Sequence, residues 1–291
     1  MHSRIVRYSE LAIALLAGVL SLGGCAHKPA RPDHIVILML ENRSYGNIIG
    51  SPNAPYLNSL LSDPNAALFT SSFGIEHPSE PNYLDLFSGS NQGVTSDSLP
   101  KGYPFTTDNL ASELIDAGKS YVTYSEDLPA VGSDTESCGL YARKHNASVN
   151  WIGTGLHQIP PTTNQTLAAF PSDYSQLPTV SMVVPNQDND MHNGVAAATI
   201  QRGDRWVKDH LDSYIHWAKE HNSLLIITFD EDDYATGNHI PTIFIGSQVK
   251  GGIYGQRIDH FSVLRTIEQL YHLRYAGKAA DASPILLFWK G

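Results

Sequence analysis

The chain has 291 residues, of which 42% are hydrophobic and 16% are charged, and its formal net charge at pH 7 is −10. This composition excludes a disordered chain and a coiled coil, and the length is sufficient for a large buried core. No basic stripe interleaved with aromatic residues is present, so nucleic acid is not an expected partner. The two cysteines, Cys25 and Cys138, are too few for a disulfide framework or a cysteine-rich zinc site.

The beginning of the chain has the pattern of an export signal. Arg4 and Arg7 precede an apolar run over 11–22, which is shorter than the ~20 residues that a helix needs to span a bilayer. A basic segment followed by an apolar core of this length is typical of a signal peptide. We therefore predict a signal peptide over 1–24.

The apolar run ends in Leu22-Gly23-Gly24-Cys25, which resembles a bacterial lipobox. In that motif a cysteine follows small residues and is diacylated before cleavage. We favour lipid attachment at Cys25 over ordinary signal cleavage, in which this cysteine would be incidental. A short tether over 25–32 would then hold an exported protein at a membrane. Ala26 after the cysteine favours the outer membrane or another periplasm-facing position.

Four apolar runs in the rest of the chain predict buried strands. They lie at 34–40, 179–184, 224–229 and 241–246. Near-continuous apolar runs of this kind are typical of parallel strands that are covered on both faces. The sequence therefore predicts a sheet with both faces buried.

Apolar residues recur at helical spacing between these runs. Helices are predicted at 206–218 and at 260–271, the latter behind Asp259 as a candidate N-cap, and 107–117 is a third candidate. Residues 125–178 are rich in Pro, Ser, Thr and Asn and predict an irregular segment that covers one end of the sheet. We expect a single α/β domain over 33–291.

Carboxylates and amides follow three of the predicted strands. Glu41 and Asn42 follow the first strand, Asp190 and His192 come after the second, and the acidic run 230–233 follows the third. Ligands bind beyond the carboxyl ends of strands in open α/β sheets, so these side chains should gather at one edge. Each group alone is explained by a solvated turn or a helix cap. Their occurrence together favours a metal site with oxygen ligands, which suit hard divalent cations.

The segment His77-Pro78-Ser79-Glu80-Pro81-Asn82-Tyr83-Leu84 predicts the start of a helix. Pro81 sits where the first turn tolerates proline. Ser79 would stand at or near the helix N-terminus, where backbone N–H groups and the helix dipole favour an anion. Ser79 is then either an ordinary cap, which is the more frequent role, or a metal-bound nucleophile that attacks a phosphoryl group.

These residues together resemble the phosphoesterase family that contains bacterial and fungal acid phosphatases and bacterial phospholipases C, within the alkaline phosphatase superfamily. The likeness is carried in order by 34–45, 77–83, 177–186 with 189–192, 228–233 with 240–246, and 260–268. The resemblance implies a three-layer α/β sandwich with a mostly parallel central sheet, as in alkaline phosphatase. The length resembles the compact acid-phosphatase branch, because the phospholipases usually carry extra C-terminal modules.

The resemblance also implies a metal centre with a nucleophile. It implies a divalent metal held by Glu41, Asn42, Asp230 and Glu231, with Ser79 as nucleophile and further ligand. If only oxygen donors bind, the cation is expected to be Mg²⁺, Ca²⁺ or Mn²⁺.

The remaining site residues are also implied by the resemblance. Asn82 would hold phosphoryl oxygens, and protonated His192 would donate to the leaving group. Asp190 and His260 are further candidates for substrate binding, although His260 could instead only cap its helix. His239 is either a metal ligand or a turn residue, and as a ligand it would make Zn²⁺ plausible. The role of His77 is left open, and His145 and His157 are expected at the surface.

The function predicted from the sequence is a metal-dependent phosphomonoesterase of the acid phosphatase type, acting through a phosphoserine on Ser79. Its substrate would be a small phosphate ester or a phospholipid-derived compound, with phosphorylated lipids such as phosphoinositides as one candidate class. One alternative is a phosphodiesterase of the phospholipase C type. The other is a non-enzymatic lipoprotein that binds a metal or a phosphate group.

Overall fold

The computed structural model describes residues 31–286 and 288–290. The predicted signal peptide, the lipid-attachment residue Cys25 and most of the predicted tether lie outside the described residues. Within the described ranges, no helix combines the length and the apolar character that a membrane span requires.

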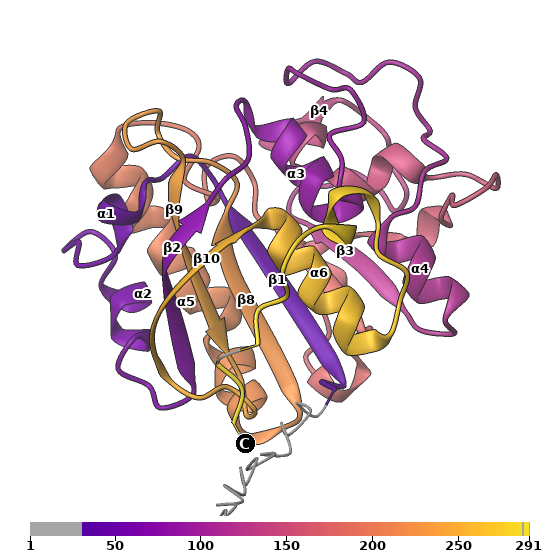
Figure 1. The fold of residues 1–291 in the computed structure, drawn as a ribbon. Helices are drawn as coiled ribbons and strands as arrows, with labels where there is room; N and C mark the ends of the chain where they lie inside the picture. Colours follow the sequence, from indigo (N-terminus) through magenta and orange to yellow (C-terminus); the bar gives the residue numbers. More distant parts are fainter. Residues whose placement is uncertain (1–30, 287, 291) are drawn as a thin grey trace, which may run out of the picture.

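An eight-stranded sheet forms the centre of the molecule (Figure 1), in the order β10-β2-β9-β8-β1-β7-β3-β6. The strands are β1 (His34–Leu40), β2 (Ala66–Phe73), β3 (Tyr121–Ser125), β6 (Asn164–Thr166), β7 (Val180–Val184), β8 (Ser223–Phe229), β9 (His239–Ile245) and β10 (Gly252–Asp259). All neighbouring pairs are parallel except the two that involve β9. The prediction of a mostly parallel sheet is confirmed.

The prediction that the run 241–246 is a parallel strand is wrong. This run forms most of β9, which pairs antiparallel with both β2 and β8. The connection 230–238 between β8 and β9 is shorter than the roughly dozen residues that a parallel crossover needs. The strand is buried on both faces whatever its direction, so its apolar run does not report its direction. As a result, the acidic loop 230–238 lies at the carboxyl edge of the parallel strands.

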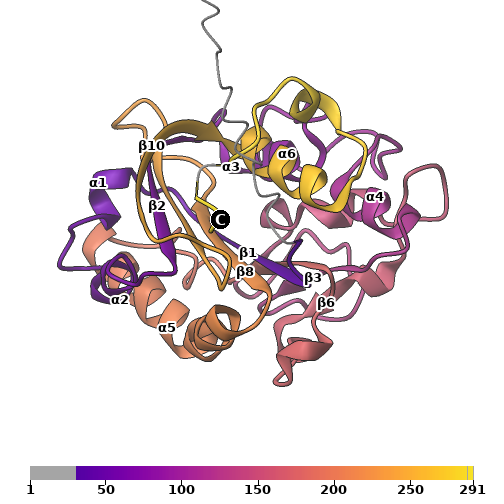
Figure 2. The same ribbon diagram turned by 60° about the horizontal axis from the view of Figure 1, so that its bottom comes forward.

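Helices cover both faces of the sheet and complete a three-layer sandwich (Figure 2). One face packs against α1 (Tyr45–Ile48), α2 (Pro55–Leu60) and α5 (Ala196–Glu220), and the other against α3 (Ser79–Ser88), α4 (Leu110–Asp116) and α6 (His260–Tyr271). The alternation along β1 explains the two cores, because Ile35 and Ile37 join the α3–α4–α6 side while Val36 and Leu38 join the α5 side. Each such buried aliphatic side chain contributes about 1.5–3 kcal/mol. The predicted three-layer architecture is confirmed.

The helices predicted from periodicity are present. Residues 206–218 lie within α5, and α6 begins after Asp259, whose carboxylate accepts the Ser262 N–H at 2.8 Å. The candidate helix 107–117 is shorter than predicted. It forms α4, with Asn109 as the N-cap that accepts the Ser112 N–H.

Four strands of the sheet were not predicted from the sequence, the short edge strand β6 and the three longer strands β2, β3 and β10. The second half of β2 contains Thr70, Ser71 and Ser72, and β10 is a largely exposed edge strand that contains Gly252 and Gly255. β3 has only five residues. None of the three offers a continuous apolar run.

The segment 125–178 is mostly irregular, as predicted. It contains short 3₁₀ turns, the edge strand β6 and a small hairpin of β4 (Ser137–Cys138) and β5 (Tyr141–Ala142). Among the turns, η1 (Arg143–His145) packs against α3. This turn brings two side chains to the carboxyl edge of the sheet, as described below.

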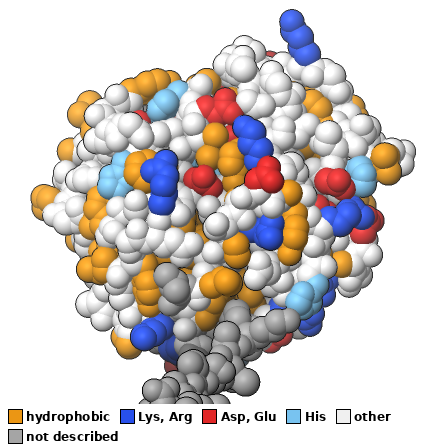
Figure 3. Space-filling model, in the orientation of Figure 1, with side chains coloured by type: hydrophobic (Ala, Val, Ile, Leu, Met, Phe, Trp, Pro, Cys, Tyr) orange, Lys and Arg blue, Asp and Glu red, His pale blue; other side chains and the backbone are white. Residues whose placement is uncertain are grey.

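The surface seen in the orientation of Figure 1 carries charge of both signs. Acidic and basic side chains are interspersed there, and apolar side chains are scattered among them (Figure 3). Scattered apolar side chains are ordinary on a folded domain.

Candidate functional site

The parallel pairing of β1 and β8 brings the carboxylates that follow them together. Leu40 of β1 is in register with Phe229 of β8, so Glu41 and Asp230 leave the sheet side by side. The Asp230 N–H donates to the Leu40 carbonyl at 3.0 Å. Both carboxylates are fully buried. The predicted gathering of these residues at one edge is therefore observed.

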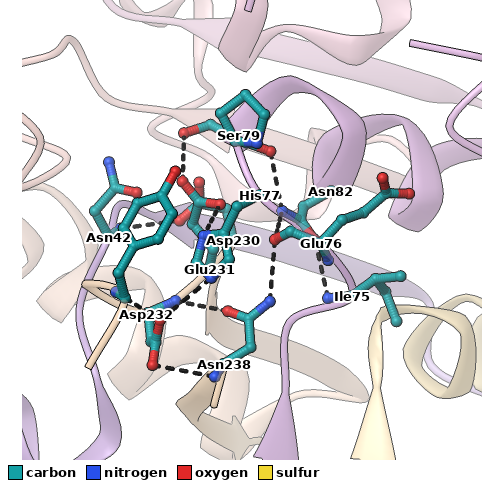
Figure 4. Close-up of polar contacts among 12 residues, drawn as sticks. Asn42, Ile75, Glu76, His77, Ser79, Asn82, Asp230, Glu231, Asp232 and Asn238 are labelled. Carbon is teal, nitrogen blue, oxygen red and sulfur yellow. Dashed lines mark hydrogen bonds and ion pairs between the residues drawn. The ribbon is translucent and has the colours of Figure 1, made fainter. Parts of the chain in front are cut away.

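Ser79 is the first residue of α3 and faces these carboxylates (Figure 4). Its Oγ lies 3.0 Å from Glu41 Oε2 and 3.3 Å from Glu231 Oε1, as donor in both contacts. The N-cap position is occupied by Pro78, and no side chain caps the helix. The predicted place at the helix N-terminus is correct, but the hydroxyl does not cap the helix. It is directed at two acids.

Asn42 connects the two strand ends. Its backbone N–H donates to Asp230 Oδ1 at 2.9 Å, and its side-chain amide donates to Glu41 Oε2 at 3.2 Å. Its φ of 53° lies in the left-handed region, which asparagine tolerates better than most residues. The turn after β1 therefore places both Glu41 and Asn42 at the cluster.

The electrostatics of this cluster favour a bound cation or a shared proton. Burial raises the pKa of Asp230 well above its ordinary value, and the charges of Glu41 and Glu231 raise it further. Burial and the charge of Glu41 raise the pKa of Glu231 to about 8. Within the described chain, Asp230 Oδ2 has no hydrogen-bond partner. Buried carboxylates this close repel one another unless a cation or a proton lies between them. The donor set fits a hard divalent cation.

The acidic run 230–233 is not a solvated turn as a whole. Asp230, Glu231 and Asp232 are buried, and only Asp233 is exposed. Asp232 accepts the backbone N–H groups of Tyr234, Thr236 and Asn238. Burial acts to raise the pKa of Asp232, but these hydrogen bonds outweigh it and lower the pKa. Asp232 therefore fixes the backbone conformation of the loop 234–238.

His77 lies against the same acids. Its Nδ1 is 2.5 Å from Glu231 Oε2, its Nε2 is 3.4 Å from Asp232 Oδ1, and its ring stacks on Tyr234 with centroids 4.0 Å apart. Burial lowers the pKa of His77 despite the charge of Asp232. His77, whose role the sequence left open, therefore lies directly beside Glu231.

His145 is buried in the site, so the expectation that it lies at the surface is wrong. Its Nε2 is 3.2 Å from Glu41 Oε1 and its Nδ1 is 3.1 Å from Asp190 Oδ2. The Tyr83 hydroxyl, from the next turn of α3, donates to the same Glu41 oxygen. Burial lowers the pKa of His145 to about 4. His157, by contrast, is half-buried beside Asp108, 3.3 Å from its carboxylate.

His192 shares a cavity of about 230 Å³ with Ser79. Its Nε2 is 3.2 Å from Lys144 Nζ, and its Nδ1 is 3.0 Å from Asn193 Oδ1. Glu41, His145 and His192 offer ligand atoms within 4.8 Å of one another, so nitrogen donors for a metal are also at hand. Because a lysine ammonium only donates, the Nε2 that faces it is the acceptor.

Asn82, the expected phosphoryl ligand, is not among the residues that line the cavity with Ser79. Its Oδ1 accepts the N–H groups of Ile75 and Glu76, and its Nδ2 donates to the carbonyls of Glu76 and Pro78. All hydrogen-bonding positions of the amide are thereby used. Figure 4 shows this side chain turned toward Ile75 and Glu76. Asn82 therefore holds the loop that presents Ser79.

The other candidates for substrate binding also act on neighbouring residues. Asp190 Oδ1 accepts the His192 N–H at 2.8 Å, while its other oxygen faces His145. Burial raises the pKa of Asp190 to about 7. His260 is buried, with Nε2 2.6 Å from the Asp230 carbonyl. Both therefore position site residues, and neither lines the cavity that holds Ser79.

His239 is not brought into contact with the carboxylate cluster. Its Nε2 lies 3.0 Å from the Thr70 carbonyl, and its ring stacks between Tyr45 and Phe73, with centroids 4.7 and 5.2 Å away. This geometry matches the turn-residue alternative at the start of β9. We therefore leave His239 out of the proposed ligand set.

Comparisons with known proteins place this geometry in context. A model of the Phosphoesterase family matches residues 51–274. The chain is 46% identical over 258 residues to the phosphatidylinositol-3-phosphatase of Mycobacterium tuberculosis, covering 88% of this chain and 82% of that protein. It is 26% identical to a probable acid phosphatase of Kluyveromyces lactis, covering 83% of this chain but only 59% of that protein.

Solved structures share the fold at low sequence identity. A protein of the alkaline phosphatase superfamily from Vibrio parahaemolyticus matches with a TM-score of 0.58 at 14% identity, over 84% of this chain and 68% of that one. The C-terminal periplasmic domain of EcEptC from Escherichia coli, in complex with Zn, matches with a TM-score of 0.53 at 13% identity, over 84% of each chain. The predicted alkaline-phosphatase-like fold is confirmed.

Proposed function

Because the chain belongs to the Phosphoesterase family and is thus a phosphoric ester hydrolase, we propose that it is a metal-dependent phosphomonoesterase with Ser79 as its nucleophile. The observation that carries this proposal is the Ser79 hydroxyl, which begins α3, points at two buried carboxylates and shares a cavity with His192. The non-enzymatic alternative is set aside because the family is one of hydrolases.

The residues that would hold the metal are Glu41, Asn42, Asp230 and Glu231, together with the Ser79 oxygen. Their fit rests on the burial of the three carboxylates and on the unpartnered Asp230 oxygen. When bound, a divalent cation would neutralise the carboxylates and polarise a phosphoryl oxygen. Oxygen donors favour Mg²⁺, Ca²⁺ or Mn²⁺, and the nearby nitrogens of His145 and His192 make Zn²⁺ a further candidate.

Ser79 would attack the phosphorus of the ester while one of its two carboxylate partners accepts the hydroxyl proton. A bond forms between Ser79 Oγ and phosphorus, the ester P–O bond breaks, and the leaving alcohol takes up one proton. Water then attacks the phosphoserine, which restores the hydroxyl and releases inorganic phosphate. The positive end of the α3 dipole favours the anionic group at this place.

We propose that His192 is the histidine that protonates the leaving group, because it lines the same cavity as Ser79. To donate a proton, however, it would have to lose the hydrogen bond that its Nε2 accepts from Lys144. Its proposed role is therefore tied to that lysine.

Phosphorylated lipids such as phosphoinositides are the substrate class that we propose, with small phosphate esters as the broader class. The support is the phosphatidylinositol-3-phosphatase relative, which this chain matches over most of its length. A phosphodiesterase of the phospholipase C type is the alternative, and no contact in the described site favours it. We further propose that the protein is exported and anchored through Cys25.

A panel of substrates tests the proposal. We expect hydrolysis of p-nitrophenyl phosphate and phosphatidylinositol 3-phosphate, weak or no hydrolysis of bis(p-nitrophenyl) phosphate, and loss of turnover with a chelator. Acid quenching with labelled substrate should leave phosphate on the peptide that contains Ser79. A preference for the diester would favour the phospholipase alternative, and turnover without a trapped phosphoserine would count against the mechanism.

A further inference from the structure

Lys144 is a half-buried cation at the edge of the site. It lies in η1, its side chain is 17% exposed, and its Nζ donates to Asp97 Oδ2 at 2.7 Å. The same nitrogen lies 3.2 Å from His192 Nε2. A lysine side chain carries a proton at neutral pH, and the carboxylate of Asp97 stabilises that charge. The side chain is therefore an ammonium.

Arg43 lines the cavity that contains Ser79 and uses its terminal nitrogens to brace the turn after β1, while its buried Nε has no hydrogen-bond partner among the described residues. Its two terminal nitrogens donate to the carbonyls of Asn42 and Met191 and to the Thr199 hydroxyl. These contacts brace the turn after β1. They leave Arg43 as a structural support of the loop that carries Glu41 and Asn42.

Lys144 also has a donor to spare. An ammonium has three N–H groups, and two acceptors are present, Asp97 and His192. Both of these acceptors line the cavity that contains Ser79, whereas Lys144 itself lines the neighbouring cavity, whose wall also includes Asp97. Asp97 also accepts the Glu80 N–H at 3.0 Å, so it fixes the lysine to the first turn of α3. The ammonium is thus held directly behind two side chains of the cavity wall.

We propose that Lys144 is a catalytic residue that donates a charge-assisted hydrogen bond to a phosphoryl oxygen of the substrate, with Asp97 as its positioning residue. The inference rests on the function proposed above. A phosphate ester that approaches Ser79 meets three buried carboxylates, and a second cation besides the metal offsets that repulsion. The competing explanation is an ion pair that only fastens η1 to α3.

Two binding affinities separate these explanations. Lys144 lies near the carboxylates, so the substitution Lys144→Met should leave Mn²⁺ affinity unchanged or make it tighter. The same substitution should weaken the binding of inorganic phosphate to the Mn²⁺-loaded protein by roughly ten-fold or more. A purely structural ion pair predicts instead that both affinities fall together with the melting temperature.

The experiment is titration calorimetry with Mn²⁺ alone, followed by inorganic phosphate, on wild type and variants. Lys144→Arg should keep most of the phosphate affinity because it keeps the charge. Asp97→Asn keeps an acceptor for the Glu80 N–H but removes the carboxylate that holds Lys144, so it should weaken phosphate binding, though less than Lys144→Met does. Lys208→Met is the control, because Lys208 is exposed on α5 and lines a different cavity.

Unchanged phosphate affinity in Lys144→Met would overturn the inference, as would a parallel loss of both affinities. If Lys144→Met does not fold, the Asp97→Asn arm decides, and unchanged phosphate binding there would equally overturn the inference. If the wild type hydrolyses esters and Lys144→Met binds phosphate normally, only this inference is rejected. A wild type that neither binds phosphate nor hydrolyses any ester rejects the proposed function as well.

Discussion

Ser79 Oγ donates a hydrogen bond to Glu41 Oε2 at 3.0 Å, across the boundary between α3 and the end of β1. A serine that caps a helix uses its oxygen to accept a backbone N–H of its own first turn. Here the hydroxyl instead donates its proton to a carboxylate from another part of the chain. This direction of the hydrogen bond separates a nucleophile from a cap, and it makes Ser79 the first residue to test.

Ser79→Ala should abolish turnover while the melting temperature changes little. No capping bond is lost, whereas a true cap would cost about 1 kcal/mol and leave the chemistry intact. Ser79→Thr should keep slight activity, because β-branching restricts the hydroxyl to fewer rotamers. Steady-state kinetics and thermal denaturation check this, with Ser62→Ala, an exposed serine, as the control. Substantial turnover by folded Ser79→Ala would reject the mechanism.

Asp230→Asn and Glu231→Gln should each lower activity by roughly two orders of magnitude or more, because each removes a charged ligand. Without metal, both variants should be more stable than wild type, since they relieve the repulsion among buried carboxylates. Thermal melts in chelator and in Mn²⁺ should therefore rank the proteins in opposite orders. Asp233→Asn, at the exposed end of the run, is the control. If the proteins rank in the same order of melting temperature in chelator and in Mn²⁺, the result would count against a metal at this cluster.

The carboxylate part of the site was predictable from the sequence because its residues follow strands directly. Glu41 and Asp230 come at the ends of apolar runs, and parallel neighbours bring such ends together. Lys144 and His145 gave no such signal, since they lie in an irregular segment without periodicity. They reach the site only because η1 packs against α3, a tertiary contact that local spacing does not encode.

The same limit explains the errors at the strands. The apolar run of β9 reports burial, whereas its antiparallel direction follows from the short connection after β8.

Asn82 matched the family pattern by position. Its amide is nevertheless used up by the loop of Ile75 and Glu76, which only the folded backbone reveals.

Cys25→Ser should release the protein from the membrane fraction or leave it unprocessed, because a diacylated cysteine supplies the expected anchor. Fractionation of cells that express the tagged protein measures this. Cys138→Ser is a matched control, since Cys138 is an exposed free cysteine within the folded domain. Unchanged membrane association of a stable Cys25→Ser protein would contradict the lipoprotein proposal.

The stability of the fold should depend on pH through Glu113, far along the chain from the carboxylate cluster. Glu113 lies in α4 and is buried, and neither of its carboxylate oxygens has a hydrogen-bond partner among the described residues. Burial and the charge of Glu268 on α6 raise its pKa from 4.5 to about 9. The folded state therefore holds a proton that the unfolded state releases between these two values.

This proton makes the free energy of unfolding fall as pH rises. The contribution of Glu113 is fully present below pH 4.5, declines above it, and is lost once pH passes about 9. Glu113→Gln keeps the shape of the side chain and removes the titration. Because one pKa unit corresponds to about 1.4 kcal/mol, the variant should melt at least ~3 °C above wild type at pH 9. At pH 5 the two should nearly coincide.

Melting curves of wild type and Glu113→Gln at pH 5, 7 and 9 measure this difference, and the comparison cancels groups that titrate equally in both proteins. Glu220→Gln, on the exposed end of α5, removes the same charge from the surface and should leave the pH profile of wild type unchanged. Glu268, whose pKa burial raises to about 8, should respond to Glu113→Gln, since loss of the neighbouring charge makes its own ionisation easier. A Glu113→Gln profile parallel to that of wild type from pH 5 to 9 would show that this carboxyl is ionised in the folded protein.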